Sequence, residues 1–560
     1  MPQVTRRTSV HDVVVIGSGA GGGTVTKVLA DMGISVLLME AGPMFELADI
    51  KEHKWPYDYP HRGVGERAEG YFGRSPFSFN AFYGGAQIEG EPYTVATGSE
   101  FSWFRSRIIG GRTNHYGRTT LRFSDYDFKP HAGDGLGTDW PITYEDVAPY
   151  YDKAERFIGV TGTSEGLRSA PDGIFQPPAP PRAHEILMKR ACDRLGIPCI
   201  AGRQAVITRP TNGRQPCHYC GQCTRACRTA SNYASSYVQI FPAMATGRVE
   251  VLTNAMAREL MTDDTGKVVA VSYVDKATRT ERQVRCRTVV LSASACESAR
   301  LLLNSRSSRH PQGLANSSGV VGRNLADTVG STAQGYIPAL AGTPRYNSDG
   351  YSVHAYMPWW LPDRNDLGFT RGYHIQPVGG FGMPSIGAFQ RTVDRHEGYG
   401  TSLKQAIRDE YGAFVSLEGL GEMIPNEQSY CEIDPGAVDQ WGIPVLRFHW
   451  ARGDGEVRQA QHMQQTFRAI IESMGGTVIS TTPMSRGGGM IHEVGTVRMG
   501  ADPKTSPLNR FCQAHEVKNL FVADAGPFVS SPEKNPTHTI VALAWRTAEY
   551  LAEEMRKGNV

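Results

Sequence analysis

The opening forty residues limit the fold of this chain more than any later segment does. An apolar run from Asp12 to Ile16 leads directly into the glycine-rich segment GSGAGG, and an amphipathic stretch follows from about Gly21 to Met32. A second apolar run, Ser35 to Met39, ends at Glu40. This pattern predicts a strand, a glycine turn, a helix and a second strand. Such a βαβ unit is typical of an α/β fold with a parallel sheet.

The glycine turn has the spacing of a dinucleotide-binding loop. Gly17, Gly19 and Gly22 form GxGxxG, which allows a tight turn, close approach of a pyrophosphate and close packing of helix against strand. Glu40, at the end of the second strand, is placed to accept hydrogen bonds from ribose hydroxyls. The coincidence of motif, context and acidic residue favours a bound dinucleotide over an unliganded turn. The motif alone fits FAD or NAD.

Charge and hydropathy exclude several classes of partner. The 560 residues carry 58 Lys and Arg against 56 Asp and Glu, a formal charge of +2, so the sequence predicts no nucleic-acid binding. No run approaches the roughly 18 apolar residues of a membrane span. Arg6 and Arg7 resemble a twin-arginine start, but the apolar run after them is too short for a signal segment. We therefore expect no signal or membrane span on this chain, and cytoplasmic localisation by default.

Four of the ten cysteines lie within eleven residues. Cys217, Cys220, Cys223 and Cys227 have the Cx2Cx2Cx3C spacing of bacterial ferredoxins, although Arg228 replaces the proline that usually follows. The run predicts an iron-sulfur cluster, [4Fe-4S] or [3Fe-4S], held by four or three thiolates. Structural zinc and a loop without metal are the alternatives.

The remaining sequence predicts a second region inserted into the nucleotide-binding fold. A long irregular excursion is expected over residues 44–99, and the proline cluster at 176–183 indicates a boundary. Short β-rich runs and a helix return the chain to the nucleotide-type sheet within 248–304. An aromatic-rich, glycine-rich stretch at about 328–480 is assigned to substrate binding. A strand at 520–523 and an amphipathic helix at about 537–556 close the chain.

Three late motifs reveal a family resemblance. IHEVGTVRMG (491–500), FVADAG (521–526) and NPTHT (535–539), together with IGGRTNHYGR and VVLSASACESARLLL in family order, resemble the glucose-methanol-choline (GMC) oxidoreductases. The resemblance implies an α/β chain, α+β overall, with a Rossmann-like FAD-binding domain and an inserted, mainly antiparallel substrate domain, as in p-hydroxybenzoate hydroxylase. It implies a discontinuous FAD-binding domain at 1–45, 100–140, 200–325 and 481–560, with substrate-binding or cap regions at 46–99, 141–199 and 326–480.

The resemblance also implies catalytic residues. The family's base falls on His492 and its partner on Asn535, while Asp524 matches the acidic residue near FAD; a strand-end cap is the other interpretation of Asp524. The chemistry agrees, because an imidazole with a pKa near 6.5 can remove a hydroxyl proton as hydride leaves, and an amide can donate to the alkoxide. His538, three residues after Asn535, is expected to be structural.

IGGRTNHYG resembles the flavin-contacting loop of pyranose oxidases, in which a histidine followed by an aromatic is covalently joined to the flavin. This implies FAD contacts by Gly110, Gly111, Asn114 and His115, and His115 is the candidate for a covalent bond; a non-covalent contact is the other possibility. Arg112 and Arg118 could face phosphate or solvent. The aromatic segment 356–360 could form a sugar-stacking wall or belong to the core.

Together these features predict an FAD-dependent sugar or glycoside dehydrogenase similar to glycoside 3-dehydrogenases. The resemblance implies oxidation of a ring hydroxyl, at C3, to a 3-keto sugar: His492 takes the proton, hydride passes to flavin N5, and electrons leave singly through the cluster. It also implies a small accessory subunit, a cytochrome-type acceptor, and periplasmic localisation if the two subunits are exported together.

Three other functions fit parts of the sequence. A peroxide-producing sugar oxidase would need no cluster, and its cysteines would be structural. A non-catalytic flavin and iron-sulfur electron relay would not need the His492 and Asn535 pair. A long-chain alcohol dehydrogenase would need an apolar channel, which the polar, glycine-rich middle of the chain does not favour.

Overall fold

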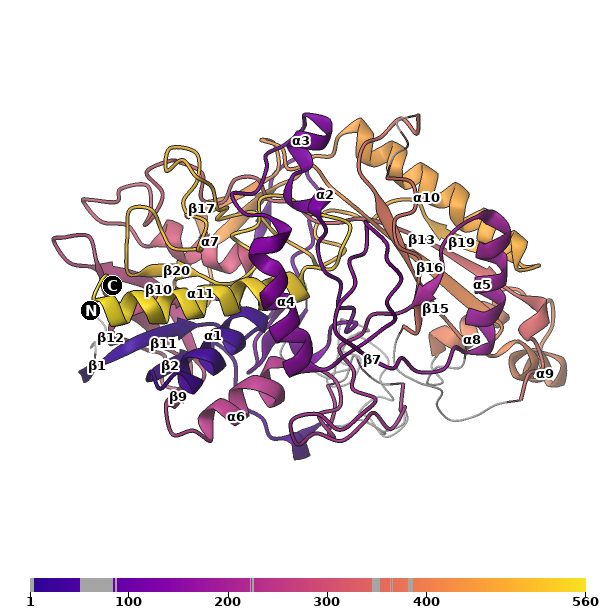
Figure 1. Ribbon diagram of the computed structural model, residues 1–560, viewed down its shortest axis with the longest axis horizontal. Helices are drawn as coiled ribbons and strands as arrows, with labels where there is room; N and C mark the ends of the chain where they lie inside the picture. The colour runs from indigo at the N-terminus through magenta and orange to yellow at the C-terminus, as the bar shows by residue number, and fades with distance from the viewer. Residues whose placement is uncertain are drawn as a thin grey trace.

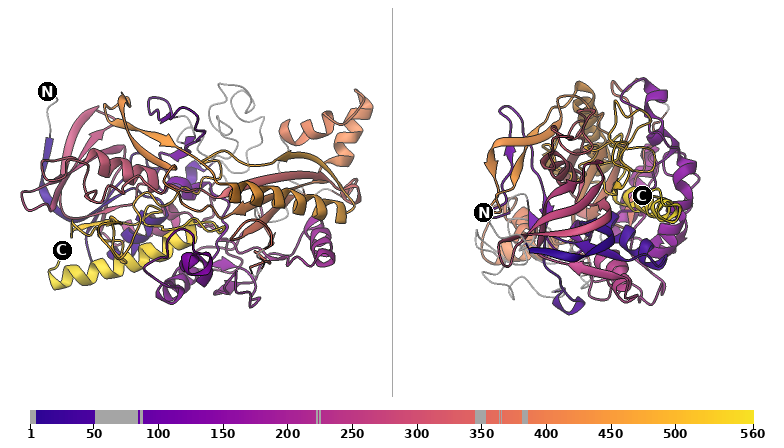
Figure 2. Two further views of the ribbon diagram at one scale, coloured as in Figure 1. Left: turned by 90° about the horizontal axis from the view of Figure 1, so that it is seen from above. Right: turned by 90° about the vertical axis from the view of Figure 1, so that its left-hand side faces the viewer.

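The computed structural model describes residues 5–50, 84–85, 88–221, 223, 226–344, 353–362, 364, 366–380 and 386–560. Most of the excursion expected at 44–99 therefore lies outside the described residues. Both ends of the chain lie at the same end of an elongated molecule (Figure 1), and they stand apart across that end when it is seen from above (Figure 2). Seen from above, the N-terminal sheet occupies this end and an antiparallel sheet the other (Figure 2).

The larger sheet is built around the predicted βαβ unit. Its strands run in the order β10-β11-β12-β1-β2-β9, and β20 pairs with β12. β1, β2, β9, β12 and β20 are parallel where they pair, whereas β10, β11 and β12 form antiparallel hairpins. The bounds of these strands are β1 Thr5–Ile16, β2 Val36–Met39, β9 Val249–Leu252, β10 Ala255–Thr262, β11 Val268–Asp275, β12 Thr280–Leu291 and β20 Leu520–Val522.

The register brings four chemically important turns to one edge of this sheet. Ile16 pairs with Met39 and with Leu291, and Leu291 pairs with Val522. Because the carboxyl ends of parallel strands meet at one edge, the segments that follow these residues converge there. Ligands of open α/β sheets bind at this edge.

Helices cover both faces of the larger sheet. Val13 and Val15 face α1 (Ala20–Asp31) and the closing helix α11 (Thr537–Lys557), whereas Val14 and Ile16 pack on the side of α7 (Ala295–Asn304). Burial on both faces explains the continuous apolar run of β1. α4 (Tyr144–Ile158) packs against α11 (Figure 1).

The smaller sheet is antiparallel and runs β15-β16-β13-β19. Its bounds are β13 Val329–Tyr336, β15 Tyr373–Gly379, β16 Phe414–Gly421 and β19 Thr477–Thr482. α10 (Asp454–Ser473) packs across β13, β16 and β19, and α5 (Ala183–Leu195) packs on α10 (Figure 1). A Rossmann-like sheet joined to an antiparallel sheet confirms the predicted fold class.

Shorter elements connect the two sheets. They are β3 Gly84–Gly85, β4 Thr94–Val95, β5 Arg105–Ser106, α2 Asp125–Phe128, α3 Pro130–Asp134, β6 Val160–Thr161, β7 Phe175–Gln176, β8 Ile200–Ala201, α6 Phe241–Met244, β14 Ala355–Tyr356, α8 Ile386–Val393, α9 Thr401–Glu410, β17 Tyr430–Val438 and β18 Pro444–His449. Short 3-10 segments lie at Leu47–Asp49, Gly111–Asn114 and Pro338–Leu340, and a π-helical turn lies at Ser236–Ile240.

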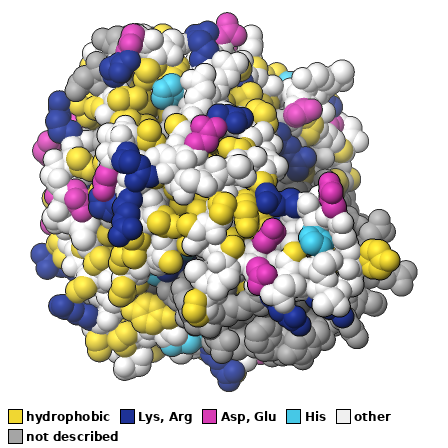
Figure 3. Space-filling view, turned by 90° about the vertical axis from the view of Figure 1, so that its right-hand side faces the viewer, with side chains coloured by type: hydrophobic (Ala, Val, Ile, Leu, Met, Phe, Trp, Pro, Cys, Tyr) yellow, Lys and Arg dark blue, Asp and Glu magenta, His cyan; other side chains and the backbone are white. Residues whose placement is uncertain are grey.

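The surface at the antiparallel-sheet end mixes apolar, basic and acidic side chains (Figure 3). α5 and α8, which lie at this end, carry the exposed residues Ile186, Leu195 and Val393. Among the helices that the structure describes, none is both long enough and apolar enough to cross a bilayer.

Candidate active site

The glycine turn has the backbone geometry that its motif predicts. Gly17 has φ +97°, and its amide donates to the Met39 carbonyl at 2.8 Å. A Cβ on Gly17 would lie 2.3 Å from the Ser292 carbonyl oxygen, and one on Gly22 would lie 1.8 Å from the Gly17 oxygen. A Cβ on Gly19 would meet only open space. The turn is thus packed behind and open in front, which suits close approach of a phosphate.

Glu40 follows β2 directly and lies buried beside this turn. One carboxylate oxygen accepts from Ser18 Oγ at 2.5 Å, and the other accepts from the Gly42 amide at 2.8 Å. Burial raises the pKa of Glu40, and these hydrogen bonds oppose the rise. The carboxylate lines the cavity at the sheet edge, where a ribose hydroxyl is expected.

A cavity of about 920 Å³ extends from the glycine turn to the antiparallel sheet. Most of the predicted site residues line it: Gly17, Gly19, Glu40, Gly111, His115, His492, Asp524 and Asn535. Gly22, Gly110 and Asn114 lie behind its wall. Gly110 donates to Ser18 Oγ at 2.8 Å, and Asn114 donates to the Ile109 carbonyl at 2.8 Å, so both brace the loop 110–115.

His492 and Asn535 lie together in this cavity. His492 Nε2 is 3.4 Å from Asn535 Nδ2, and His492 Nδ1 is 2.9 Å from Thr328 Oγ1. Asn535 Oδ1 accepts from Gln376 Nε2 at 2.8 Å, so the amide nitrogen faces the imidazole. This arrangement favours a proton on Nδ1, donated to Thr328, and an Nε2 lone pair that accepts from Asn535 Nδ2 at the cavity lining.

The surroundings keep His492 neutral. Burial, reinforced by the positive charge of Arg112, lowers the pKa of His492 to about 3. The turn that carries the imidazole is fixed by Asp327, whose carboxylate accepts from the amides of His492 at 2.9 Å and Met490 at 3.2 Å. A neutral, oriented imidazole can accept a proton from a bound hydroxyl.

The two arginines that the sequence left unassigned have different environments. Arg112 lines the cavity and pairs with Glu493 at 2.6 Å. Arg118 is buried, donates to the Asn114 carbonyl at 3.0 Å, and lies over the Tyr116 ring at 4.7 Å. Arg118 therefore stabilises the loop from behind, and neither arginine faces bulk solvent freely.

His115 and Asp524 both line this cavity. His115 is buried, and its Nε2 has no hydrogen-bond partner among the described residues. Burial, with the charges of Arg118 and Arg112, lowers the pKa of His115 to about 3. Asp524 accepts from Ser298 Oγ at 2.5 Å and from the Gly526 amide at 2.7 Å, and burial raises its pKa to about 6. Asp524 thus caps its own turn as well as lining the cavity.

The cysteine loop borders the cavity. Cys220 lines it, Cys217 and Cys223 pack beside Val206, and Cys227 lies in the core beside α1. No three of these four sulfur atoms, all of them in the described part of the chain, lie within 4.8 Å of one another. Thiolates on one zinc ion are about 3.8 Å apart, so the sulfur atoms are not gathered here as they would be around a bound zinc ion.

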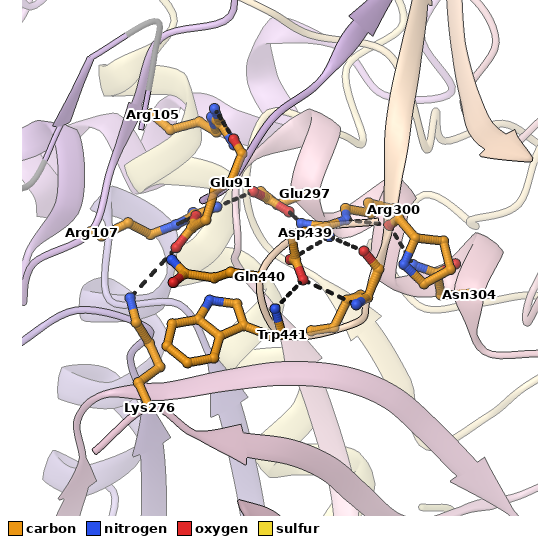
Figure 4. A network of polar contacts seen from close by, with 12 residues as sticks. Glu91, Arg105, Arg107, Lys276, Glu297, Arg300, Asn304, Asp439, Gln440 and Trp441 are labelled. Atoms are coloured by element: carbon orange, nitrogen blue, oxygen red, sulfur yellow. Dashed lines mark hydrogen bonds and ion pairs between the residues drawn. The ribbon is translucent and has the colours of Figure 1, made fainter. Parts of the chain in front are cut away.

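A network of buried ion pairs (Figure 4) contributes Arg107, Glu297 and Arg300 to the cavity lining. Arg107 pairs with Glu91 at 2.8 Å and with Glu297, and Arg300 pairs with Asp439 at 2.8 Å. The neighbouring arginines, Arg107 first, hold the pKa of Glu297 at about 2 against the effect of burial. This part of the lining therefore keeps its charges paired and its shape fixed.

Two expectations fell on residues away from the cavity. His538 is buried, contacts Glu155 at 3.1 Å and does not line the cavity, as expected of a structural residue. In the segment 356–360, Tyr356, Met357 and Trp359 are buried in the core and do not line the cavity. Thr328, Gln376 and Asp327 were not assigned a role from the sequence, since none belongs to a motif that marks it, whereas Arg112 lies inside IGGRTNHYGR and only its environment was left open.

Comparison with known proteins identifies the family. Two family models for GMC oxidoreductases match residues 12–329 and 425–544. The chain belongs to the GMC oxidoreductases, FAD-dependent enzymes that act on CH–OH groups. The family resemblance inferred from the late motifs is thereby confirmed.

Several relatives match almost the whole chain. 2-methyl-1,2-propanediol dehydrogenase of Mycolicibacterium austroafricanum is 31% identical, over 98% of this chain and 96% of its own. The fructose dehydrogenase large subunit of Gluconobacter japonicus is 27% identical over 99% and 100%, and paromamine 6'-oxidase of Streptomyces fradiae is 28% identical over 98% and 92%. The crystal structure of pyridoxine 4-oxidase from Mesorbium loti, 16% identical, covers 97% of this chain and 99% of its own with a TM-score of 0.61, which supports the fold.

Proposed function

We propose that this enzyme oxidises a secondary ring hydroxyl of a sugar or glycoside, at C3, to a 3-keto sugar. One observation carries the proposal: the His492 and Asn535 pair lines the same cavity as the glycine turn. The relatives named fructose dehydrogenase and paromamine 6'-oxidase support a sugar substrate. The C3 position rests on the similarity of the chain to glycoside 3-dehydrogenases.

The cavity fits FAD. The turn at Gly17 and Gly19 would hold the pyrophosphate, Glu40 would bind the ribose, and the loop carrying Gly111 and His115 would border the flavin. The unpartnered Nε2 of His115 is a buried polar atom that a cofactor can satisfy. Bound FAD supplies the hydride acceptor of the reaction.

The protein's own residues activate the hydroxyl. His492 Nε2 accepts the hydroxyl proton, and Thr328 holds the Nδ1 proton that fixes this tautomer. Asn535 Nδ2 donates to the developing alkoxide oxygen, because Gln376 holds the opposite end of the amide. The two nitrogen atoms, 3.4 Å apart, border one position for the substrate oxygen.

An iron-sulfur cluster on the cysteine loop is the proposed exit for the electrons. The loop adjoins the cavity through Cys220, which is the location a one-electron carrier needs. We expect Cys220→Ala to lose iron and sulfide and most of the turnover with an artificial one-electron acceptor. Cys286→Ala, at a buried cysteine of β12, is the matched control and should keep the cluster.

An anaerobic absorbance spectrum before and after addition of glucose or methyl glucoside tests the main proposal. Flavin bands that bleach with sugar, together with iron and sulfide in the same sample, are the expected result. A flavin that no sugar reduces would contradict the sugar proposal and favour a non-catalytic electron relay.

A peroxide-producing oxidase is the second candidate, and the relatives named as oxidases favour it. Such an enzyme would bleach with sugar, contain no iron after anaerobic purification, and form hydrogen peroxide in air without an added acceptor. The ratio of hydrogen peroxide formed to sugar oxidised, measured in air without an added acceptor, therefore separates the oxidase from the dehydrogenase.

Two further proposals concern assembly and the cofactor bond. The relative named as a large subunit supports a small accessory subunit here, and a cytochrome-type acceptor is the proposed destination of the electrons. A stable, active single chain from cells without a companion gene would contradict the proposal of an accessory subunit.

Acid precipitation tests whether His115 is joined covalently to the flavin. A flavin that stays with the wild-type protein and not with His115→Ala indicates a covalent bond. Release of the flavin from both proteins indicates a non-covalent contact.

A further inference from the structure

Glu418 presents a carboxylate to the cavity from the antiparallel sheet. It lies on β16, is half-buried and lines the cavity together with Leu420, two residues further along the same face of the strand. The opposite face of the sheet packs on α10, since a Cβ on Gly419 would meet Met463 and Phe467 of that helix. Glu418 therefore faces the cavity because of the strand's alternation.

The other carboxylates of the cavity lining already have partners. Glu40 accepts from Ser18 and Gly42, Glu297 and Glu493 pair with arginines, and Asp524 accepts from Ser298 and Gly526. Glu418 differs from them, because the described part of the chain offers its carboxylate no hydrogen bond or ion pair. Burial raises the pKa of Glu418, and no neighbouring group there offsets this cost.

The register places Glu418 beside the catalytic pair. Gln376 on β15 lies directly opposite Glu418, and Thr332 on β13 lies opposite it on the other side. Side chains of directly opposed residues stand on the same face, with Cβ atoms about 5 Å apart. Gln376 in turn donates to Asn535, so Glu418 is one side chain removed from the residue that orients the substrate oxygen.

We propose that Glu418 is a specificity-determining residue that accepts hydrogen bonds from a second donor on the substrate, a hydroxyl near the carbon that is oxidised. The inference rests on the proposed function, because it assumes a polyhydroxylated substrate in this cavity. A half-buried carboxylate without a protein partner is satisfied by such a donor and loses this hydrogen bond with a substrate that lacks it. Glu418 would thus select polyols and sugars over simple alcohols.

The test uses the flavin-loaded enzyme with methyl glucoside and its 2-deoxy, 4-deoxy and 6-deoxy analogues. The rate constant of anaerobic flavin reduction and the apparent substrate Kd are measured for wild type, Glu418→Gln and the control Glu472→Gln. Glu472 is a carboxylate on α10 whose ion pair with Arg468 is exposed to solvent. Equal flavin content shows that each variant is folded.

We expect one deoxy analogue to react on the order of 10- to 100-fold less efficiently than methyl glucoside in the wild type. Glu418→Gln should lose a similar factor on methyl glucoside and little more on that analogue, whereas Glu472→Gln should behave as wild type. A variant that loses the same factor on every substrate, or loses nothing, overturns the assignment of Glu418. Discrimination among the analogues by the wild type is a second measure that needs no variant.

Two outcomes separate the remaining questions. A 2-amino-2-deoxy glycoside could reduce the flavin more efficiently than the glycoside with a hydroxyl at C2, and Glu418→Gln could abolish this difference. In that case Glu418 accepts a hydrogen bond from an ammonium group, and its proposed role stands. If no sugar of any kind reduces the flavin, the proposed function fails. Reduction by sugars that is indifferent to Glu418 leaves the function standing and removes this inference alone.

Discussion

The role of His492 depends on its direct neighbours Thr328 and Asn535 and on Gln376, which contacts Asn535. Gln376 holds Asn535, Asn535 presents its amide nitrogen to Nε2, and Thr328 takes the proton on Nδ1. The same imidazole without these neighbours would rotate freely and exchange tautomers. The catalytic unit at this scale is therefore a chain of four polar side chains drawn from distant parts of the sequence.

Removal of the imidazole should slow flavin reduction far more than it weakens binding. We expect His492→Ala to lower the rate constant of sugar-dependent flavin reduction by about 10²- to 10⁴-fold with a small change in apparent Kd. Stopped-flow absorbance under anaerobic conditions measures both quantities. His449→Ala is the matched control, because His449 pairs with Glu432 outside the cavity lining. A rate reduced less than tenfold would contradict the assignment of His492 as base.

The pH dependence of the reaction should reflect the depressed pKa of His492. The base is the neutral imidazole, so activity is lost only when pH falls through the pKa, which burial lowers to about 3. We expect kcat/KM with a non-titrating acceptor to stay flat from pH 8 down to about pH 5. An acid limb with an apparent pKa near 6.5 would show instead that the imidazole titrates as it does in water.

A single methyl group added in the first turn of α1 would disrupt the packing of this helix against the larger sheet. A Cβ on Gly21, in the first turn of α1, would lie 1.5 Å from the Ala523 carbonyl oxygen at the end of β20. We expect Gly21→Ala to separate α1 from β20, lowering the melting temperature and the fraction of protein that retains flavin. Gly455→Ala in α10 is the control, since a Cβ there meets nothing within 4 Å. Unchanged flavin content in Gly21→Ala would contradict this packing argument.

The elements with local sequence patterns were predicted well. The expected strand at 12–16, helix at 21–32 and strand at 35–39 appear as Thr5–Ile16, Ala20–Asp31 and Val36–Met39, and the closing helix expected at 537–556 appears as Thr537–Lys557. Apolar runs and periodicity fix such elements because their burial is decided within a few residues. The extension of β1 back to Thr5 was missed, because there the strand pairs with Arg282 of β12, more than 270 residues away.

The residues of the candidate site also fall into two groups, those that lie in a local sequence motif and those that are positioned by strand pairing. The family motifs marked His492 and Asn535, and the GxGxxG spacing marked the glycines, because each of these patterns is complete within a few consecutive residues. Gln376 and Glu418 carry no such mark, because each acquires its position only when β15 and β16 pair. Contacts set by sheet register between distant strands cannot be read from one sequence.

At the scale of the whole molecule, buried carboxyl groups with opposite pKa shifts set the pH range of stability. Arginine partners lower the pKa of Glu297 to about 2, so its contribution is present above its usual value of 4.5 and is lost as pH falls toward 2. Burial raises the pKa of Asp327 and Glu422 to about 7. Their contribution is present below their usual values and is lost as pH rises through 7.

From these groups we expect the melting temperature to be highest near pH 4 to 5, to fall as pH rises from there to about 7, and to fall again as pH drops below 4. Scanning calorimetry or fluorimetry of the purified protein across pH 3 to 9 measures this. Glu422→Gln should reduce the fall in melting temperature toward pH 7, because an amide cannot lose a proton. The fall in melting temperature below pH 4 should remain. A melting temperature that rises steadily from pH 5 to pH 7 would contradict the raised pKa values of these carboxyl groups.

The N-terminal nucleotide-binding unit is completed by late parts of the chain, which matters for biosynthesis. β20 pairs with β12, and α11 packs against α1. The ribosome makes the glycine turn more than 500 residues before it makes Asp524, Asn535 and the helix that buries Val13 and Val15. A nascent chain that has exposed only its first half holds an open sheet edge and an incomplete cavity. We therefore expect FAD to be captured only after residues 520–557 have been made, and a messenger truncated before Leu520 to yield a protein that does not keep the cofactor.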